Sequence, residues 1–163
     1  MNAGDLCTRH VVYSVPGDSV EDAARLMRQF GVGDVVVVDE DNGVRRPIGI
    51  VTDRDIAVKV VAHGLAPDRL DVDEVMRQEI VTVDAQMSIE EVAKTMKSRG
   101  VRRTPVVNRQ GGLEGILSFD DIVDYLAEQM ADLAGLVHHQ QERQKRMLAG
   151  DLPDDGASSR PPE

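Results

Sequence analysis

The sequence contains an internal repeat. A shift of 69 positions superposes a segment near the N-terminus on a second, closely similar segment. The matched residues of the first segment are Ser19, Val20, Glu21, Asp22, Ala24, Met27, Gly31 and Val32. Their counterparts are Ser88, Ile89, Glu90, Glu91, Ala93, Met96, Gly100 and Val101. After a loop that differs by three residues, Gly49, Thr52, Asp55 and Ile56 match Gly115, Ser118, Asp121 and Ile122. The chain therefore consists of two copies of one folding unit.

Both copies predict the same order of elements. A short apolar strand precedes a helix whose N-cap is Ser19 or Ser88, and the apolar residues of the helix recur at the spacing of one buried face. Gly31 and Gly100 end these helices. Two β-branched runs joined by a turn-rich loop predict a hairpin, and a second helix follows it. The first strands are expected at 11–15 and 80–83, and the hairpins at 35–38 with 48–51 and 104–107 with 113–117.

Each copy buries little surface alone, so we expect the two to pack sheet against sheet into one globule. The predicted fold class is α+β, with two β-α-β-β-α repeats related by a pseudo-two-fold axis. A segment from Leu65 to Asp73, rich in Pro and Asp, is expected to link the copies. The expected boundaries are 6–66 for repeat one, 74–136 for repeat two, 137–149 for a polar helix extension and 150–163 for a disordered tail.

Charge and composition exclude several function classes. The formal net charge is -10, and no long run of Lys and Arg is present, so binding to nucleic acid or to a membrane surface is not expected. No apolar stretch approaches the roughly 18 residues that cross a bilayer, which indicates a cytoplasmic protein. Cys7 is the only cysteine, and no metal-ligand or catalytic constellation is visible. We therefore expect no metal site and no enzymatic activity.

A short motif follows each hairpin: Gly-Ile-Val-Thr-Asp-Arg-Asp-Ile at 49–56 and Gly-Ile-Leu-Ser-Phe-Asp-Asp-Ile at 115–122. A strand ends at Thr52 or Ser118 and a helix begins, so free backbone N–H groups and a hydroxyl meet where an anion can bind. The carboxylate three residues on, Asp55 or Asp121, can accept hydrogen bonds from a ribose diol. The alternative is that each pair is a capping box that serves only its own helix.

Both motifs resemble the G-h-x-[ST]-x-x-D signature of the CBS (cystathionine β-synthase) domain family, in which h is apolar, so the chain looks like a tandem CBS pair. The resemblance implies a regulatory module that binds AMP, ATP or S-adenosylmethionine, with the motif carboxylate on ribose and the hydroxyl on phosphate. It also implies that each cleft combines the motif of one copy with strands of the other. The main cleft would then contain Thr52, Arg54, Asp55, Ile80, Val81, Val101, Arg102, Arg103, Thr104 and Pro105. The second, weaker cleft would contain Ser118, Asp121, Val11, Val12, Val32, Gly33, Asp34 and Val35.

The two implied clefts differ in charge. Arg54 and Arg103 in the first correspond to Asp120 and Asp34 in the second. Because phosphate is attracted to guanidinium and repelled by carboxylate, we expect a phosphorylated ligand in the first cleft. The second cleft is expected to hold nothing or an uncharged adenosine group. The alternative is that Arg102 and Arg103 are solvated surface charges.

The expected partners follow from the same resemblance. They are an adenosine-type ligand (an adenine nucleotide or S-adenosylmethionine, with no cofactor required), a second copy of the chain and a protein effector regulated in trans. Homodimer contacts are expected on the helices after the motifs, through Ala57, Val60, Val61, Leu126, Met130 and Leu133. The competing interpretation is a ligand-free dimerisation or protein-interaction module.

Overall fold

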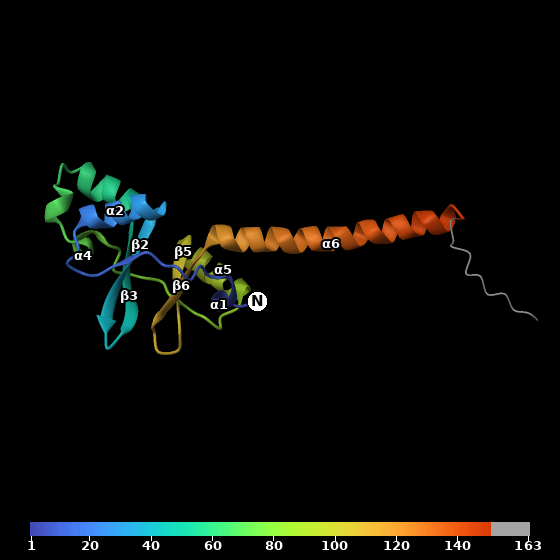
Figure 1. The fold of residues 1–163 in the computed structure, drawn as a ribbon, viewed down its shortest axis with the longest axis horizontal. Coiled ribbons are helices and arrows are strands. Elements are labelled where there is room, and N and C mark those ends of the chain that lie inside the picture. Colours follow the sequence, from blue (N-terminus) through green and yellow to red (C-terminus); the bar gives the residue numbers. More distant parts are fainter. Residues whose placement is uncertain (151–163) are drawn as a thin grey trace, which may run out of the picture. The chain divides into compact units, whose positions relative to one another are not determined.

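A computed structural model describes residues 1–150 of the chain (Figure 1). The chain forms two compact units, Met1–Val123 and Asp124–Glu163. The first unit contains repeat one and repeat two as far as Val123, and the second unit begins inside the last helix. Apart from Gly150, the predicted disordered tail at 150–163 lies outside the described residues.

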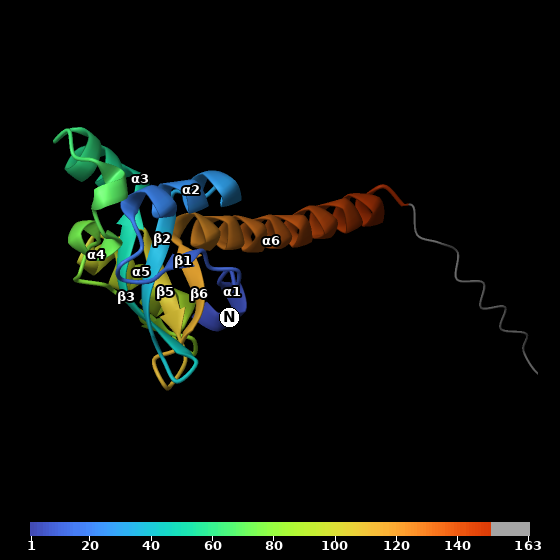
Figure 2. The ribbon, with the colours of Figure 1, turned by 60° about the vertical axis from the view of Figure 1, so that its left-hand side comes forward.

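Two three-stranded sheets with the same topology form the first unit. One contains β1 (Tyr13–Ser14), β2 (Asp34–Asp41) and β3 (Val44–Thr52), and the other contains β4 (Val83–Asp84), β5 (Arg103–Val107) and β6 (Leu113–Ser118). In each sheet the short first strand pairs parallel with the second, which forms an antiparallel hairpin with the third. The turns of both hairpins lie at the same end of this unit in Figures 1 and 2. The predicted α+β pair of repeats is confirmed, although the first strands are shorter than expected.

The helices after the first strands begin and end where the sequence predicts. They are α2 (Val20–Phe30) and α5 (Ile89–Arg99). The hydroxyl groups of Ser19 and Ser88 accept hydrogen bonds from the backbone N–H three residues on, which satisfies a donor that the helix leaves free. Gly31 and Gly100 adopt φ values of 65° and 64°, a left-handed conformation that suits glycine and ends the helix.

The helices after the motifs differ between the repeats. In repeat one, α3 (Asp53–Asp55) continues into a π-helical segment, Ile56–Val61, and the chain turns at Gly64 with φ of 66°. In repeat two, α6 (Phe119–Leu148) continues for 30 residues. No proline interrupts α6, and its sequence is rich in good helix formers such as Ala, Leu, Glu and Gln.

Two short helices that the sequence did not predict cross from one repeat to the other. The first, α1 (Ala3–Leu6), donates backbone hydrogen bonds to the carbonyl groups of Met87 and Ala85 in repeat two. The second, α4 (Val72–Val75), follows a 3-10 turn at Pro67–Arg69 and bonds in the same way to Asp18 in repeat one. The two segments that carry these helices, residues 2–8 and 71–77, are called the crossing arms below, because each is bridged at both ends to the other repeat. The segment at 65–73 thus links the copies, as expected, but it also packs into the fold, because Val72 is fully buried.

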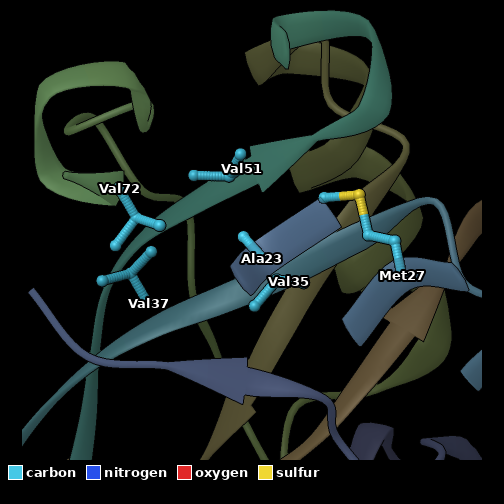
Figure 3. Packing of buried hydrophobic residues seen from close by; sticks show 6 residues of the cluster. All are labelled: Ala23, Met27, Val35, Val37, Val51 and Val72. Atoms are coloured by element: carbon cyan, nitrogen blue, oxygen red, sulfur yellow. The ribbon is translucent and has the colours of Figure 1, made fainter. Parts of the chain in front are cut away.

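The core of repeat one joins four elements (Figure 3). Side chains from α2, β2, β3 and the crossing arm of α4 meet there: Ala23, Met27, Val35, Val37, Val51 and Val72. Burying a valine side chain contributes on the order of 1.5–3 kcal/mol, so Val72 anchors the arm firmly. The segment that leads into repeat two is thus anchored in the core of repeat one.

Candidate functional site

The first cleft is a cavity of about 280 Å³ between the two repeats. Six of the predicted main-cleft residues line it: Thr52, Ile80, Val81, Val101, Arg102 and Arg103. Five others were not predicted: Asp34, Ile50, Arg77, Glu79 and Gly100. The walls are mainly aliphatic, and the arginines supply positive charge. This combination suits a ligand with a flat apolar part and an anionic part.

Four residues predicted for the main cleft do not line it. Arg54 is exposed but does not line the cavity, and Asp55 is buried, with its carboxylate hydrogen-bonded to Thr52. Thr104 and Pro105 are buried in β5, where the Thr104 hydroxyl donates a hydrogen bond to the Val81 carbonyl at 2.5 Å. Thr104 thus helps to hold the neighbouring cleft segment that contains Val81.

The second cleft is a cavity of about 260 Å³. Seven of its eight predicted residues line it: Val11, Val12, Val32, Gly33, Asp34, Ser118 and Asp121. Val35 does not, because its side chain is fully buried in the repeat-one core. The additional lining residues are Thr8, His10, Gly31, Arg103 and Ile116. The shift of 69 positions relates Thr8 and His10 to Arg77 and Glu79 of the first cleft. Once either pair is known to line a cleft, the repeat therefore predicts the other pair.

Oppositely charged side chains that were predicted for different clefts form ion pairs with each other. The Arg103 guanidinium lies 2.8 Å from an Asp34 carboxylate oxygen, and both residues line both clefts. Similarly, Arg102 donates a hydrogen bond to Asp120 at 3.0 Å. The expected difference in charge is therefore reduced: the first cleft is lined by three arginines and two carboxylates, and the second by one arginine and two carboxylates. It is reduced because Arg103 and Asp34, which occupy corresponding positions of the two repeats, come into contact.

Asp34 is an unusual member of this pair because it is only 9 % exposed. Burial raises the pKa of its carboxyl above the ordinary value, and the nearby Asp53 acts in the same direction. The Arg103 guanidinium opposes this rise. Arg103 thus favours the ionised form of the Asp34 carboxylate, which burial disfavours.

The motif hydroxyls and carboxylates form capping boxes. The Thr52 hydroxyl and N–H both donate to Asp55 Oδ2, at 2.8 and 3.1 Å, and the Asp55 N–H donates back to the hydroxyl. Ser118 and Asp121 repeat this pattern. Both pairs therefore cap their own helices, and this capping does not exclude a contact with a ligand. In each motif the second carboxylate oxygen takes no part in the capping box. Of the two aspartates, Asp121 lines its cleft and Asp55 does not.

The Asp55 carboxylate is only 5 % exposed and is enclosed by donors and cations. Its other oxygen lies 3.5 Å from both Lys59 and Arg77. Burial would raise the pKa of Asp55, but the hydrogen bonds from Thr52 and the charges of Lys59 and Arg77 outweigh it, so the pKa lies below its ordinary value. Arg77 belongs to the crossing arm, so this carboxylate also ties the two repeats together.

The lowered pKa predicts how stability depends on pH. A carboxyl group with a lowered pKa in the folded state stabilises the fold above its unfolded pKa, and this stability is lost as pH falls through the folded value. We expect Asp55→Asn to lower the free energy of unfolding by about 1–3 kcal/mol at pH 7. The deficit should shrink as pH approaches 3. Urea unfolding across this pH range measures it, with the exposed Asp68→Asn as the control. Equal deficits at both pH values would contradict the assignment.

Comparison with known proteins agrees with this architecture. The model of the CBS domain family matches residues 3–62 and 72–128. An uncharacterized protein of Methanopyrus kandleri, MK0525, is 37 % identical over 123 residues, which cover 76 % of this chain and 61 % of that protein. Hypoxic response protein 1 of Mycobacterium tuberculosis is 34 % identical over 128 residues, covering 78 % of this chain and 82 % of that protein.

Solved structures are similar as well. Hypoxic Response Protein I, solved with two coordinated zinc ions, superposes with a TM-score of 0.67 at 32 % identity and covers 76 % of this chain and 98 % of that one. The cytosolic domain of the Mg2+ channel MgtE, solved in complex with ATP, superposes with a TM-score of 0.64 at 32 % identity. This match covers 76 % of this chain and 48 % of that one.

Within residues 1–150 no helix is long and apolar enough to span a bilayer. In the same residues, no three or more His, Cys, Asp and Glu side chains gather closely enough to hold a metal ion. The candidate site is therefore the pair of clefts.

Proposed function

Because the chain belongs to the CBS domain family, we propose that it is a regulatory module without catalytic activity that binds an adenosine-containing ligand, AMP or ATP, between its two repeats. The main support is the first cleft, where an aliphatic cavity opens beside Arg102 and Arg103. The ATP complex of the MgtE cytosolic domain, a similar structure, agrees with this ligand class.

The cleft supports adenine and phosphate for separate reasons. Aromatic residues make up only 2 % of the chain, so the base would lie between aliphatic walls and bond to backbone groups of an extended segment. Ile50, Ile80, Val81 and Val101 supply those walls. Phosphate would bind Arg103 or Arg102 through paired N–H donors. To do so, Arg103 must share or leave its contact with Asp34.

The second cleft would take a different occupant. Asp34 and Asp121 both line it, and their carboxylates repel phosphate but accept hydrogen bonds from hydroxyl groups. We therefore propose that this cleft binds, at most, an uncharged adenosine group through its ribose. When phosphate engages Arg103 in the first cleft, Asp34 loses its counter-ion and the second cleft becomes more acidic.

The proposed output is a change in a protein partner in trans, with the module itself as a homodimer. Among the residues expected to form the dimer contact, Val60 is fully buried in the core and cannot take part. Its neighbours Val58 and Val61 are 52 % and 69 % exposed, so the π-helical segment still presents an apolar face. Such a face is typical of a protein contact.

Thermal unfolding tests the ligand proposal. We expect AMP or ATP to raise the unfolding midpoint by several degrees and GTP to leave it unchanged, because a ligand at about a hundred times its Kd adds roughly 2.7 kcal/mol. S-adenosylmethionine and NAD complete the panel. No shift with any compound would reject the proposal and leave the ligand-free interaction module, which the closed capping boxes and paired arginines also suit.

The choice of variant decides what this test means. Asp55→Ala is a poor test, because Asp55 does not line the cleft and its loss would weaken a cap and two ion pairs, so a lost ligand effect could come from the damaged fold alone. Arg103→Ala is the better choice, since its side chain is 46 % exposed and contacts only Asp34 among the ion pairs of the described residues.

A further inference from the structure

The second unit, of which the last helix forms the described part, carries an apolar stripe with no partner. Beyond Val123, α6 (orange to red in Figure 1) exposes Leu126, Met130, Leu133 and Val137, whose exposed fractions are 50, 71, 64 and 54 %. Met147 extends the stripe and is 63 % exposed. A row of large apolar side chains this exposed normally marks a contact surface.

The spacing of the stripe indicates the kind of partner. Apolar residues alternate in steps of four and three from Leu126 to Val137, and the same spacing continues through Gln140 and Gln144 to Met147, which is a heptad repeat with two polar layers. Met130, Val137 and Gln144 occupy the a positions. Leu126, Leu133, Gln140 and Met147 occupy the d positions. A period of 3.5 residues keeps the stripe facing another helix over its whole length of about 33 Å. The partner surface is therefore a helix.

We propose that α6 pairs with α6 of a second copy as a parallel, two-stranded coiled coil. In a parallel pair in register, each layer contains two identical residues. Gln140 then meets Gln140 of the second copy and Gln144 meets Gln144, so their amide groups can hydrogen-bond to each other. The large apolar residues likewise meet their own kind, and β-branched Val137 at a with Leu133 at d favours two strands.

An antiparallel pair fits less well. It would bring the C-terminal Gln140 and Gln144 opposite the N-terminal Leu126 and Met130. A buried amide without a hydrogen-bond partner destabilises the pair, and two such layers would occur at each end. The same cost applies to an unrelated partner helix with a wholly apolar seam. The polar residues of the seam therefore favour a second copy of this chain in the parallel orientation.

The residues beside the seam permit this pairing. The flanking e and g positions hold Ala127, Gln129, Ala134, Leu136, Gln141, Arg143 and Leu148. Arg143 alone among them is charged, so two copies meet without like-charge repulsion along most of the seam. The other ionised side chains, including Asp124, Glu128 and Glu142, occupy positions that face away from it. The proposal does not depend on ligand binding in the clefts.

Disulfide cross-linking of the full chain tests both the pairing and its direction. In a Cys7→Ser background, we would introduce one cysteine at a time, as Leu126→Cys or Gln144→Cys. Two cysteines bond only when their Cα atoms are within about 7 Å, as seam positions of a parallel pair are. We expect each variant to form mostly covalent dimer under mild oxidation. Glu142→Cys, on the outer face, is the matched control and should stay mostly monomeric on a non-reducing gel.

The remaining outcomes overturn the proposal. Cross-linking only when the Leu126→Cys and Gln144→Cys proteins are mixed would show an antiparallel pair, and equal cross-linking of the Glu142→Cys control would show random collision. No cross-linking in folded protein, checked by circular dichroism, would remove the coiled coil, whatever dimer the first unit forms. Adding Leu133→Lys to the Leu126→Cys variant should abolish the covalent dimer if the seam holds it.

Discussion

Replacing Arg103 with alanine is expected to weaken AMP binding by about 10- to 100-fold. The loss follows from one charge-assisted hydrogen-bonded contact to phosphate, which is worth about 1.5–3 kcal/mol. Removing Arg103 also leaves Asp34 without its counter-ion at the edge of the same cleft, which adds repulsion. Isothermal titration calorimetry with AMP measures the change.

Three controls make this result specific to phosphate. Adenosine lacks phosphate, so Arg103→Ala should change its affinity little. Asp34→Asn, which frees Arg103 from its ion pair, should strengthen AMP binding several-fold instead of weakening it. The exposed Arg69, remote from both clefts, is the matched arginine control. Equal losses for AMP and adenosine would mean that Arg103 holds the shape of the cleft and does not bind phosphate.

Gly115→Ala is expected to lower the free energy of unfolding by about 1–3 kcal/mol, and the midpoint by roughly 3–10 °C. The N-terminal crossing arm runs directly over this glycine. A Cβ atom there would lie 2.9 Å from the Thr8 carbonyl oxygen and 3.0 Å from Cys7 Cβ, and would overlap the Cys7 sulfur. Because Thr8 and Ile116 also exchange backbone hydrogen bonds at this crossing, the arm cannot retreat without losing them.

The corresponding glycine of repeat one provides a comparison. A Cβ on Gly49 would overlap Met76 and lie 3.1 Å from the Arg77 carbonyl, but the Met76 side chain is flexible enough to move. We therefore expect Gly49→Ala to cost less than Gly115→Ala. Gly135→Ala is the control, since its Cβ would meet nothing within 4 Å and alanine favours the helix. An unchanged midpoint for Gly115→Ala, measured by thermal unfolding, would contradict the crossing-arm packing.

The two clefts share the Asp34–Arg103 ion pair. Asp34 and Arg103 line both cavities, so a ligand that moves either side chain changes the other cleft too. Under the proposed function, phosphate in the first cleft and an uncharged group in the second would be compatible. Two phosphorylated ligands would compete for the same guanidinium. Competition for Arg103 alone would therefore make the two clefts bind phosphorylated ligands unequally, apart from any difference in their net charge.

The repeat, the capped helices and the hairpins followed from the sequence alone, because they depend on neighbours close in the chain. Ser19 and Ser88 cap helices through bonds to residues three positions away, and Gly31 and Gly100 end them through their own backbone freedom. The motif hydroxyls and carboxylates are equally local. The a and d positions of α6 are likewise local, although only Leu126, Met130 and Leu133 of this helix are expected above to contact a second copy.

Tertiary structure alone decided which charges meet and which arms cross. Arg103 and Asp34 are far apart in the chain, and nothing in their neighbourhoods distinguishes an ion pair from two solvated side chains. Asp55 proved to be enclosed because Arg77 arrives on the crossing arm of the other repeat. The crossing arms themselves are too short to show a periodic pattern, and their burial depends on a groove that exists only once both repeats have folded. Long-range contacts of this kind follow from the packing of the whole first unit.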